Sequence, residues 1–222
     1  MPDEILISIE SIGDDSSIPV EVGVNLLSPV EKARANAFRF PKHQNRYVRG
    51  RALLRQKLSR LISVPADRIE IKEEERGKPF LKDEALSFNL SHSGDLAIYG
   101  FSTSHRQIGI DLELFDRELD VDGLSKHYFS ALECLELNQF PGSEKKEMFL
   151  KIWTAKEARM KLTGEGLHLD PRSIELTFQN GVPSGFRRPT PSSQHLLVSH
   201  HESLGAVSSI VADDPFSVSS LD

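Results

Sequence analysis

Apolar side chains recur along this chain with two different spacings, one typical of helices and one typical of strands. Intervals of three and four predict long amphipathic helices over residues 45–62 and 144–163. A shorter helix is predicted over 28–38, where Ser28 and Pro29 form a favourable start. Short apolar or alternating runs predict strands over 5–10, 69–72, 86–91, 95–101, 108–114, 173–178, 194–199 and 205–212.

Each long helix is therefore accompanied by several strands. This is a weak indication of structural duplication, although no repeat is visible residue by residue. Residues 102–107 are the best candidate for a boundary between two halves, and a polar turn over 92–95 is expected to join two strands of the first half. Residues 179–193, rich in Pro, Ser and Gly, are expected to form a surface loop.

Composition changes this picture mainly through charge. The net charge is −6, yet ten of the 27 Lys and Arg residues lie in 32–66, a segment without Asp or Glu, so the rest of the chain has 17 basic and 33 acidic residues. A positive zone on an acidic protein favours a small phosphorylated ligand or an acidic protein partner over a nucleic acid. Within it, Arg51 and Arg55 lie on the apolar side of the helix, so each needs a carboxylate or a bound phosphate.

The remaining composition excludes several classes of protein. No apolar run approaches the roughly 18 residues of a membrane span, and the N-terminal residues lack the pattern of a signal peptide. We therefore expect a cytoplasmic protein without membrane association. Cys134 is the only cysteine. A single cysteine excludes an internal disulfide and a Cys-rich zinc site, but it leaves open a metal site made of His, Asp or Glu.

The strand expected over 108–114 places two carboxylates on the same face. In its sequence, IGIDLEL, the residues Gly109, Asp111 and Glu113 alternate with apolar residues. Neighbouring carboxylates repel each other, so the pair indicates either an ordinary solvated face or a bound cation that neutralises both. The adjacent glycine would leave room for a metal bridged to phosphate.

The second long helix contains the segment WTAKEARMK, in which Trp153, Glu157 and Lys161 share one face. By themselves, Glu157 and Lys161 are typical of an ordinary surface ion pair. Together with Asp111 and Glu113, however, Glu157 could complete a partial shell for Mg²⁺, which binds a few carboxylates and the phosphate oxygens of a substrate.

Two further segments offer groups that bind phosphate. The segment FNLSHSG places Ser91 and His92 at the end of an expected strand, and ERGKPF places Arg76 and Lys78 beside a Gly-Lys-Pro turn. An ordinary β-turn with a surface histidine explains the first segment equally well. A serine hydrolase is a poor alternative, since no nucleophile elbow accompanies the serine and histidine.

Taken in order and spacing, these segments resemble the signature of the 4′-phosphopantetheinyl transferases of the larger, pseudo-dimeric type that activates surfactin synthetase. The matching blocks are GKP at 77–79, FNLSHS at 88–93, IGIDLE at 108–113 and WTAKEARMK at 153–161, followed by a Gly-Glu-Gly-Leu turn. SPVEK at 28–32 and the basic helix extend the resemblance toward the N-terminus. Any one block is weak, whereas all of them in register form a strong match, which outweighs the ordinary explanations for the carboxylates.

The resemblance implies an α+β fold of two similar α/β halves, 1–105 and 106–222, related by a pseudo-twofold. Each half would be a small sheet packed on a long helix, with the active site between them. The implied enzyme transfers the 4′-phosphopantetheine group of coenzyme A to a serine of an apo acyl or peptidyl carrier protein, and releases adenosine 3′,5′-bisphosphate. We expect a monomer whose partners are coenzyme A and the carrier protein.

The resemblance also implies a metal site and catalytic roles. Asp111, Glu113 and Glu157 would bind Mg²⁺, or Mn²⁺ in its place, together with the pyrophosphate of coenzyme A. Glu157 would accept the proton of the carrier serine, directly or through water. Lys161 would stabilise the charge that builds on the bridging oxygen, and Asp111 would serve catalysis as a metal ligand.

A second implied set of residues binds the coenzyme. Lys78, Ser91 and His92 would contact its phosphates, with Arg76 beside them, and Arg34 would meet the 3′-phosphate. Residues 115–140 carry several apolar side chains and are expected to contribute to the surface that binds the carrier.

Two alternatives stay open at this point. One is a magnesium-dependent phosphohydrolase that acts on a nucleotide, with the same carboxylates and water as the nucleophile. The other is a coenzyme A-binding module without catalytic activity, against which the three carboxylates argue, because a binder needs no group that organises a metal.

Overall fold

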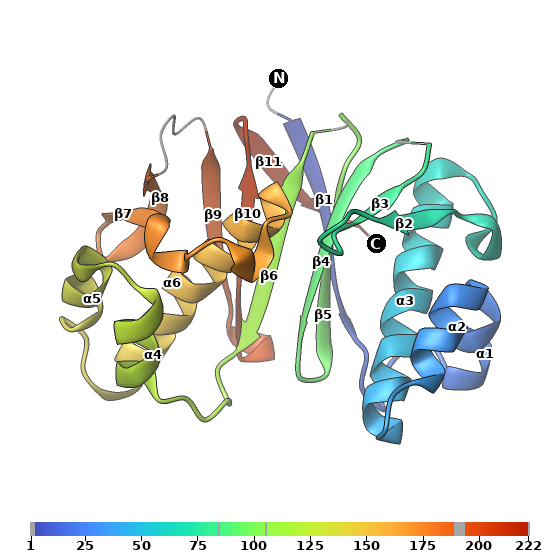
Figure 1. Cartoon of the computed structure of the whole chain (residues 1–222), viewed down its shortest axis with the longest axis horizontal. Coiled ribbons are helices and arrows are strands. Elements are labelled where there is room, and N and C mark those ends of the chain that lie inside the picture. Colours follow the sequence, from blue (N-terminus) through green and yellow to red (C-terminus); the bar gives the residue numbers. More distant parts are fainter. Residues whose placement is uncertain (1–2, 84, 105, 189–193, 222) are drawn as a thin grey trace.

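The computed structural model describes residues 3–83, 85–104, 106–188 and 194–221. Two halves lie side by side in Figure 1, with α3 (Pro41–Ile62) in the first and α6 (Gly142–Thr163) in the second. These helices confirm both long helices predicted from the sequence. In the described part of the chain, no helix is both long and apolar enough to cross a bilayer.

Each half contains a small antiparallel sheet and a two-stranded hairpin. The first half contains β1 (Asp3–Ser11), α1 (Val20–Leu26), α2 (Pro29–Asn36), α3, β2 (Ile71–Glu73), β3 (Pro79–Leu81), β4 (Ser87–Ser93) and β5 (Leu96–Ser102). The second contains β6 (Ile108–Leu114), α4 (Val121–Tyr128), α5 (Ala131–Leu137), α6, β7 (Glu175–Gln179), β8 (Val182–Arg188), β9 (His195–His201) and β10 (Ala206–Ala212). The two halves thus repeat the same order of elements, which confirms the predicted fold class.

The sheets repeat the same pairing as well. In the first sheet β5 lies between β1 and β4, and in the second β10 lies between β6 and β9, with antiparallel neighbours throughout these pairs. One strand breaks the correspondence: β11 (Phe216–Ser220) pairs in parallel with the other edge of β1. The end of the chain therefore belongs to the sheet of the first half, and the division at residue 105 stays a prediction.

Three apolar clusters hold these layers together. One packs α3 on the first sheet, with Leu54 and Phe101 fully buried, and one packs α6 on the second sheet, with Ile152 and Val211 fully buried. The third cluster joins the two sheets through the isoleucine side chains of β1, β5, β6 and β10. The halves are thus connected by a continuous core, which fixes the position of any site between them.

Two of the predicted turns differ from the structure. The turn between β4 and β5 is Gly94-Asp95 alone, with Gly94 at a φ of 57°, so His92 lies within a strand. The expected loop over 179–193 is wrong for residues 182–188, which form β8; residues 189–193 lie outside the described part of the chain. The missed signal is Asn180-Gly181, two residues with positive φ that close the β7–β8 hairpin.

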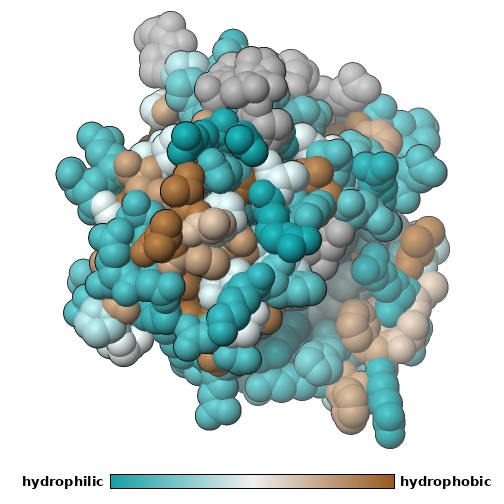
Figure 2. All heavy atoms as spheres, turned by 60° about the vertical axis from the view of Figure 1, so that its left-hand side comes forward, coloured by the Kyte–Doolittle hydropathy of each residue, from teal (hydrophilic) through white to brown (hydrophobic). Residues whose placement is uncertain are grey.

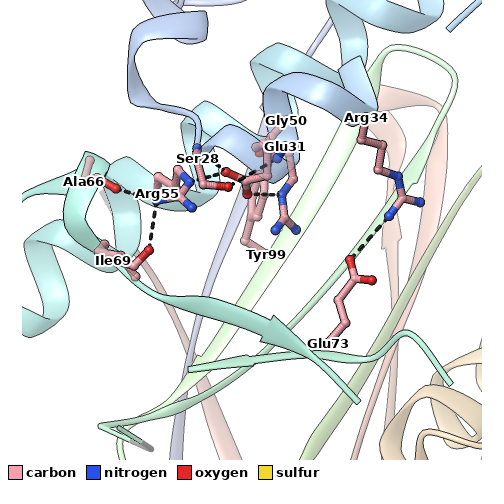
Figure 3. Close-up of polar contacts among 10 residues, drawn as sticks. Ser28, Glu31, Arg34, Gly50, Arg55, Ala66, Ile69, Glu73 and Tyr99 are labelled. Atoms are coloured by element: carbon pink, nitrogen blue, oxygen red, sulfur yellow. Dashed lines mark hydrogen bonds and ion pairs between the residues drawn. The ribbon is translucent and has the colours of Figure 1, made fainter. Parts of the chain in front are cut away.

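A buried ion-pair cluster anchors α3 in the first half (Figure 3). Ser28 and Glu31 form a capping box at the start of α2, and the Glu31 carboxylate accepts hydrogen bonds from Arg51 and Arg55, each at 2.7 Å. Arg55, 1% exposed, also donates to the carbonyl oxygens of residues 66 and 69. The prediction that both arginines need an anion is confirmed, and a single carboxylate meets it.

The second half repeats this anchor with different side chains. Ser130 and Glu133 form a capping box at the start of α5, and Lys156 of α6 lies 2.7 Å from the Glu133 carboxylate. Lys156 donates to the carbonyl oxygens of Pro171 and Ile174, three residues apart as in the first half. The duplication therefore extends to this set of contacts, although Arg55 in the first half and Lys156 in the second hide it in the sequence.

The glycine of IGIDLEL serves helix packing instead of a metal. A Cβ at Gly109 would lie 1.9 Å from the carbonyl oxygen of Ala158, so only glycine lets β6 approach the backbone of α6 this closely. The expectation that Gly109 leaves room for a metal is therefore replaced by a structural role. The close approach brings the carboxylates of β6 beside the helix that carries Glu157 and Lys161.

The Lys156–Glu133 pair leads to a stability prediction. Both side chains are 0% exposed, so Lys156→Met leaves a buried carboxylate without its cation, and we expect a loss of about 3–5 kcal/mol in the free energy of unfolding. Urea unfolding at neutral pH measures it. Lys145→Met is the control: its partner Asp122 is 69% exposed, so the loss should stay below about 1 kcal/mol. Equal losses would contradict a structural role for the buried pair.

Candidate active site

The seam between the halves is made by side chains of β4 that pair with the free edge of β6. The backbone N–H of Ile110 donates to the Asn89 Oδ1 at 3.1 Å, and that of Leu114 donates to the Ser93 Oγ at 3.3 Å. These bonds satisfy backbone groups that no strand pairs on this side. They also fix β4 against β6, with its serines opposite the carboxylates.

Asp111 is the most deeply buried of these carboxylates, at 4% exposure. Its Oδ1 accepts hydrogen bonds from the Ser91 hydroxyl and the Lys161 ammonium, each at 2.7 Å. Its Oδ2 is buried and has no hydrogen-bond partner. Burial raises the pKa of Asp111 above its usual value, although Lys161 and Ser91 oppose the shift. An ordinary solvated strand face is therefore excluded for Asp111.

Glu113 is held in the same way by a serine and a cation. Its Oε2 accepts a hydrogen bond from the Ser93 hydroxyl at 2.6 Å and forms an ion pair with Arg117. Arg117 follows β6 in the chain and lies in none of the matching sequence blocks. Each carboxylate of the strand thus has one hydroxyl of the first half and one cation of the second as partners.

Glu157 faces these two carboxylates from α6. Its pKa is raised from 4.5 to about 7, mainly by burial and further by the negative charges of Asp111 and Glu113, while Lys161 lowers it. The negative charges of Asp111 and Glu113 thus act on Glu157, and the role of the three carboxylates as one metal site stays a prediction. A divalent cation would relieve this repulsion.

The donor set fits Mg²⁺, although the carboxylates are not yet gathered around one point. Among the residues that the structure describes, no three His, Cys, Asp or Glu side chains already form a metal cluster. The carboxylates of β6 are instead turned toward Ser, Lys and Arg partners. The unpartnered buried Oδ2 of Asp111 is the kind of hard oxygen ligand that Mg²⁺ prefers.

A cavity of about 360 Å³ lies between α3 and β4 on the first-half side of the carboxylates. His92 opens into it, and its pKa is lowered by shielding from bulk water and by the positive charges of Lys161 and Arg46. Arg46 in turn pairs with Asp95 of the β4–β5 turn at 2.6 Å. The other polar lining residues are His43, Tyr47, Arg51, Ser91 and Tyr99. Arg46 and Arg51 are thus paired with Asp95 and Glu31, and the rest of the lining is largely apolar.

A second cavity of about 250 Å³ is lined by residues of both halves. It is lined by Arg76, Lys78 and Asn89 of the first half and by Lys161 of the second. Lys78 donates to the Leu162 carbonyl oxygen at 2.8 Å, and burial lowers its pKa. Leu90 lines both cavities, so the two cavities adjoin at β4, and Ser91 lines the larger one.

Arg34 is the one predicted coenzyme contact that lies away from these groups. It pairs with Glu73 of β2 at 3.3 Å (Figure 3), and its guanidinium lies 5.6 Å from the centre of the Tyr47 ring, at the rim of the larger cavity. The structure therefore brings together Asp111, Glu113, Glu157, Lys161, Ser91 and His92, with Arg76 and Lys78 at the second cavity and Arg34 at the rim of the first.

Sequence reasoning missed several residues of the site. Asn89 and Ser93 form hydrogen bonds with β6, a contact that no local pattern in the sequence indicates. For Arg117, the only local signal is its spacing of four residues from Glu113. Arg46 and Tyr47 had a signal, because they begin the basic helix and flank its apolar face.

Comparison with known proteins places the chain in a family. The profile described as "4'-phosphopantetheinyl transferase superfamily" matches residues 107–212, and the one described as "4'-phosphopantetheinyl transferase, N-terminal" matches 17–104. The 4′-phosphopantetheinyl transferase HetI of Nostoc is 41% identical over 68% of this chain and 65% of its own length. Sfp of Bacillus subtilis, also a 4′-phosphopantetheinyl transferase, is 30% identical over 69% of this chain and 68% of its own.

The chain therefore belongs to the 4′-phosphopantetheinyl transferase family. The matched segments span 58–65% of the length of HetI and of three other bacterial relatives. A crystal structure of a holo-(acyl-carrier-protein) synthase from Bacillus anthracis has a TM-score of 0.43 and 24% identity to this chain, over 48% of this chain and 93% of that one. That likeness is too limited to support a conclusion about the site.

The raised pKa of Glu157 predicts a pH dependence of stability in buffer that contains a chelator. Between about pH 4.5 and 7 the native protein binds more protons than the unfolded chain, so stability falls as the pH rises through this window. Glu157→Gln removes the titrating group, and the variant should lose less stability than the wild type between about pH 5 and 7.5. Urea unfolding across this range measures the difference. Parallel curves for the two proteins would show that Glu157 titrates normally.

Proposed function

We propose that this chain transfers the 4′-phosphopantetheine group of coenzyme A to a serine of an acyl or peptidyl carrier protein, and releases adenosine 3′,5′-bisphosphate. The observation that carries the proposal is the meeting of two sets of groups at the seam. Three carboxylates and Lys161 come from the second half, and Ser91, His92, Arg76 and Lys78 come from the first. Family membership supports the same activity.

Asp111, Glu113 and Glu157 would hold Mg²⁺, or Mn²⁺ in its place. When bound, the cation would neutralise the charge on the pyrophosphate of coenzyme A. The Oδ2 of Asp111 supports this assignment because it is buried without a partner. Lys161 and Arg117 now neutralise Asp111 and Glu113, so both cations have to give way, or share the carboxylates, when metal and coenzyme bind.

The transfer itself needs a base for the serine proton and a positive charge that stabilises the leaving group. The carrier serine hydroxyl attacks the β-phosphorus, a bond from serine oxygen to phosphorus forms, and the bond to the bridging oxygen breaks. Glu157 faces the seam from α6 and would take the serine proton, directly or through water. Lys161 is placed to stabilise the negative charge on the departing bisphosphate.

The basic groups around β4 would bind the phosphates of the coenzyme. Ser91 and His92 lie in the wall of the larger cavity, and Arg76 and Lys78 line the smaller one. Arg34, at the rim, would meet the 3′-phosphate. A monomeric state, a cytoplasmic location and the absence of nucleic acid and membrane partners stay predictions from the sequence.

The decisive experiment incubates the protein with coenzyme A, Mg²⁺ and a panel of purified apo carrier proteins, followed by intact mass measurement. A phosphopantetheine adduct on a carrier supports the proposal. Release of adenosine 3′,5′-bisphosphate without any carrier would instead indicate a phosphohydrolase. Coenzyme A binding without either product would leave a binding module.

The carboxylates lead to a prediction about catalysis. Asp111→Ala should abolish transfer while the protein still unfolds cooperatively, because a metal ligand is lost. Glu157→Gln keeps the shape but removes the basicity, so transfer should fall by roughly 10²-fold or more. Transfer rates with and without chelator, and thermal unfolding of both variants, provide the measurements. Near-normal turnover in chelator, or by a folded Asp111→Ala protein, would refute the metal assignment.

The surface that would receive the carrier lies on α4 and α5. Most apolar side chains of residues 115–140 are packed in the core of the second half. Two are not: Leu132 is 42% and Leu135 64% exposed on α5. Figure 2 brings this side of the molecule forward and shows apolar atoms gathered on it. An exposed apolar patch of this kind is typical of a protein-binding surface.

Leu135→Asp tests this surface. A charge in the contact should raise the KM for the carrier by about fivefold or more, equivalent to about 1 kcal/mol, while the affinity for coenzyme A stays unchanged. Steady-state kinetics with an apo carrier that the wild-type protein modifies measures the KM, and calorimetry with coenzyme A measures the affinity for the coenzyme. Val22→Asp is the control, since Val22 is 49% exposed on α1 of the other half. Weaker binding of both substrates would mean that α5 has only a structural role.

A further inference from the structure

We propose that Glu73 sets how strongly this chain selects coenzyme A over the same molecule without its 3′-phosphate, because Glu73 holds Arg34 in the coenzyme-free protein. The inference rests on the proposed function, since it takes coenzyme A as the ligand. Glu73 lies outside the sequence blocks that carry the family resemblance, and its importance follows from its contact alone.

The contact joins two elements that are distant in the chain. Arg34 projects from α2 and Glu73 from β2, and Figure 3 shows their charged ends directed at each other. The guanidinium Nη1 lies 3.3 Å from the Glu73 Oε1, with side-chain exposures of 61% and 49%. The same guanidinium lies 5.6 Å from the centre of the Tyr47 ring. Arg34 therefore lies between Glu73 and a residue of the cavity wall.

The charge of Glu73 also reaches the cavity. The pKa of the Tyr47 hydroxyl is raised mainly by burial, and the negative charges of Glu31 and Glu73 add to the increase, while Arg51 and Arg34 oppose it. Tyr47 lines the same cavity as Ser91 and His92. An anion that enters at this rim is consequently repelled by the Glu73 carboxylate. It also meets the Arg34 guanidinium, which is already paired with that carboxylate.

The consequence for binding is a competition between two anions. Carboxylate and phosphate both accept charge-assisted hydrogen bonds from a guanidinium, so the 3′-phosphate has to displace Glu73 or share Arg34 with it. An exposed ion pair of this kind changes an equilibrium by about two- to fivefold. A ligand without the 3′-phosphate has no group at this position and is not affected. Glu73 therefore weakens coenzyme A selectively and lowers the discrimination between the two ligands.

The chain offers a closely matched control on the same hairpin. Glu70 and Lys82 form an ion pair at 2.8 Å with side-chain exposures of 63% and 54%, next to β2 and β3 but without a contact to Arg34 among the described interactions. Glu70→Gln removes the same charge from nearly the same place in the chain. Any general effect of one fewer negative charge appears in both variants.

Calorimetry with coenzyme A and with 3′-dephospho-coenzyme A tests the proposal at low ionic strength, without metal and without any carrier. Glu73→Gln should bind coenzyme A about two- to fivefold more tightly and 3′-dephospho-coenzyme A with unchanged affinity. Glu70→Gln should change neither. The gain should shrink at about 1 M salt, where exposed charges are screened.

Arg34 supplies a second test through a double-mutant cycle. Arg34→Ala should weaken coenzyme A much more than 3′-dephospho-coenzyme A, because the lost contact exists only in the former. In that background, Glu73→Gln should no longer tighten coenzyme A. A gain that persists without Arg34, an equal gain with Glu70→Gln, or an equal change for both ligands would overturn the proposal.

The outcomes also separate this inference from the proposed function. The wild-type protein could modify a carrier while Glu73→Gln leaves the ratio of the affinities for coenzyme A and 3′-dephospho-coenzyme A unchanged. That result would overturn the role of Glu73 alone. Protein whose ratio shifts as expected but that modifies no carrier of the panel would support the role of Glu73 and count against the transferase activity.

Discussion

The constraint on which the site depends is the free edge of β6. A strand inside a protein cannot leave its backbone N–H groups unpaired, and β6 has a strand partner, β10, on one side only. On the other side Asn89 and Ser93 of β4 accept the hydrogen bonds through their side chains. A strand paired through backbone would have closed the sheet. Pairing through short polar side chains instead keeps the seam polar and leaves Asp111 and Glu113 beside the serines of β4.

The first half shows the alternative solution to the same problem. Leu96 of β5 is opposite Ser11, as Ala206 of β10 is opposite Leu114, so β1 corresponds to β6 position by position. In this register Glu10 corresponds to Glu113, whereas a serine, Ser8, stands where the second half has Asp111. The outer edge of β1 is closed by β11 through ordinary strand pairing. Glu10 forms an ion pair with Lys57 of α3, so the position that corresponds to Glu113 has a structural role in the first half.

Counter-ions explain how the site can exist before any ligand binds. A buried carboxylate is costly unless it is paired, and β6 carries two of them close together. Lys161 neutralises the first and Arg117 the second, each beside a serine hydroxyl. Glu157 has neither a cation of its own nor a described hydrogen bond of its carboxylate, and the elevated pKa records the cost. Arg34 and Arg46 of the first half are likewise paired with carboxylates, those of Glu73 and Asp95.

The sequence by itself determined the two long helices, the strand IGIDLEL and the α+β class, and its short blocks indicated the family. Helical and strand periodicity depend on neighbours a few residues apart, and the spacing of short blocks is likewise a property of the chain. Only the tertiary structure decided that Ser91 meets Asp111 and Lys161, residues separated by 20 and 70 positions, and that Glu73 holds Arg34. It also revealed the duplication, since the ion pair of Glu31 with Arg55 anchors α3 as the ion pair of Glu133 with Lys156 anchors α6. Contacts of this kind depend on the packing of whole halves, which no local pattern encodes.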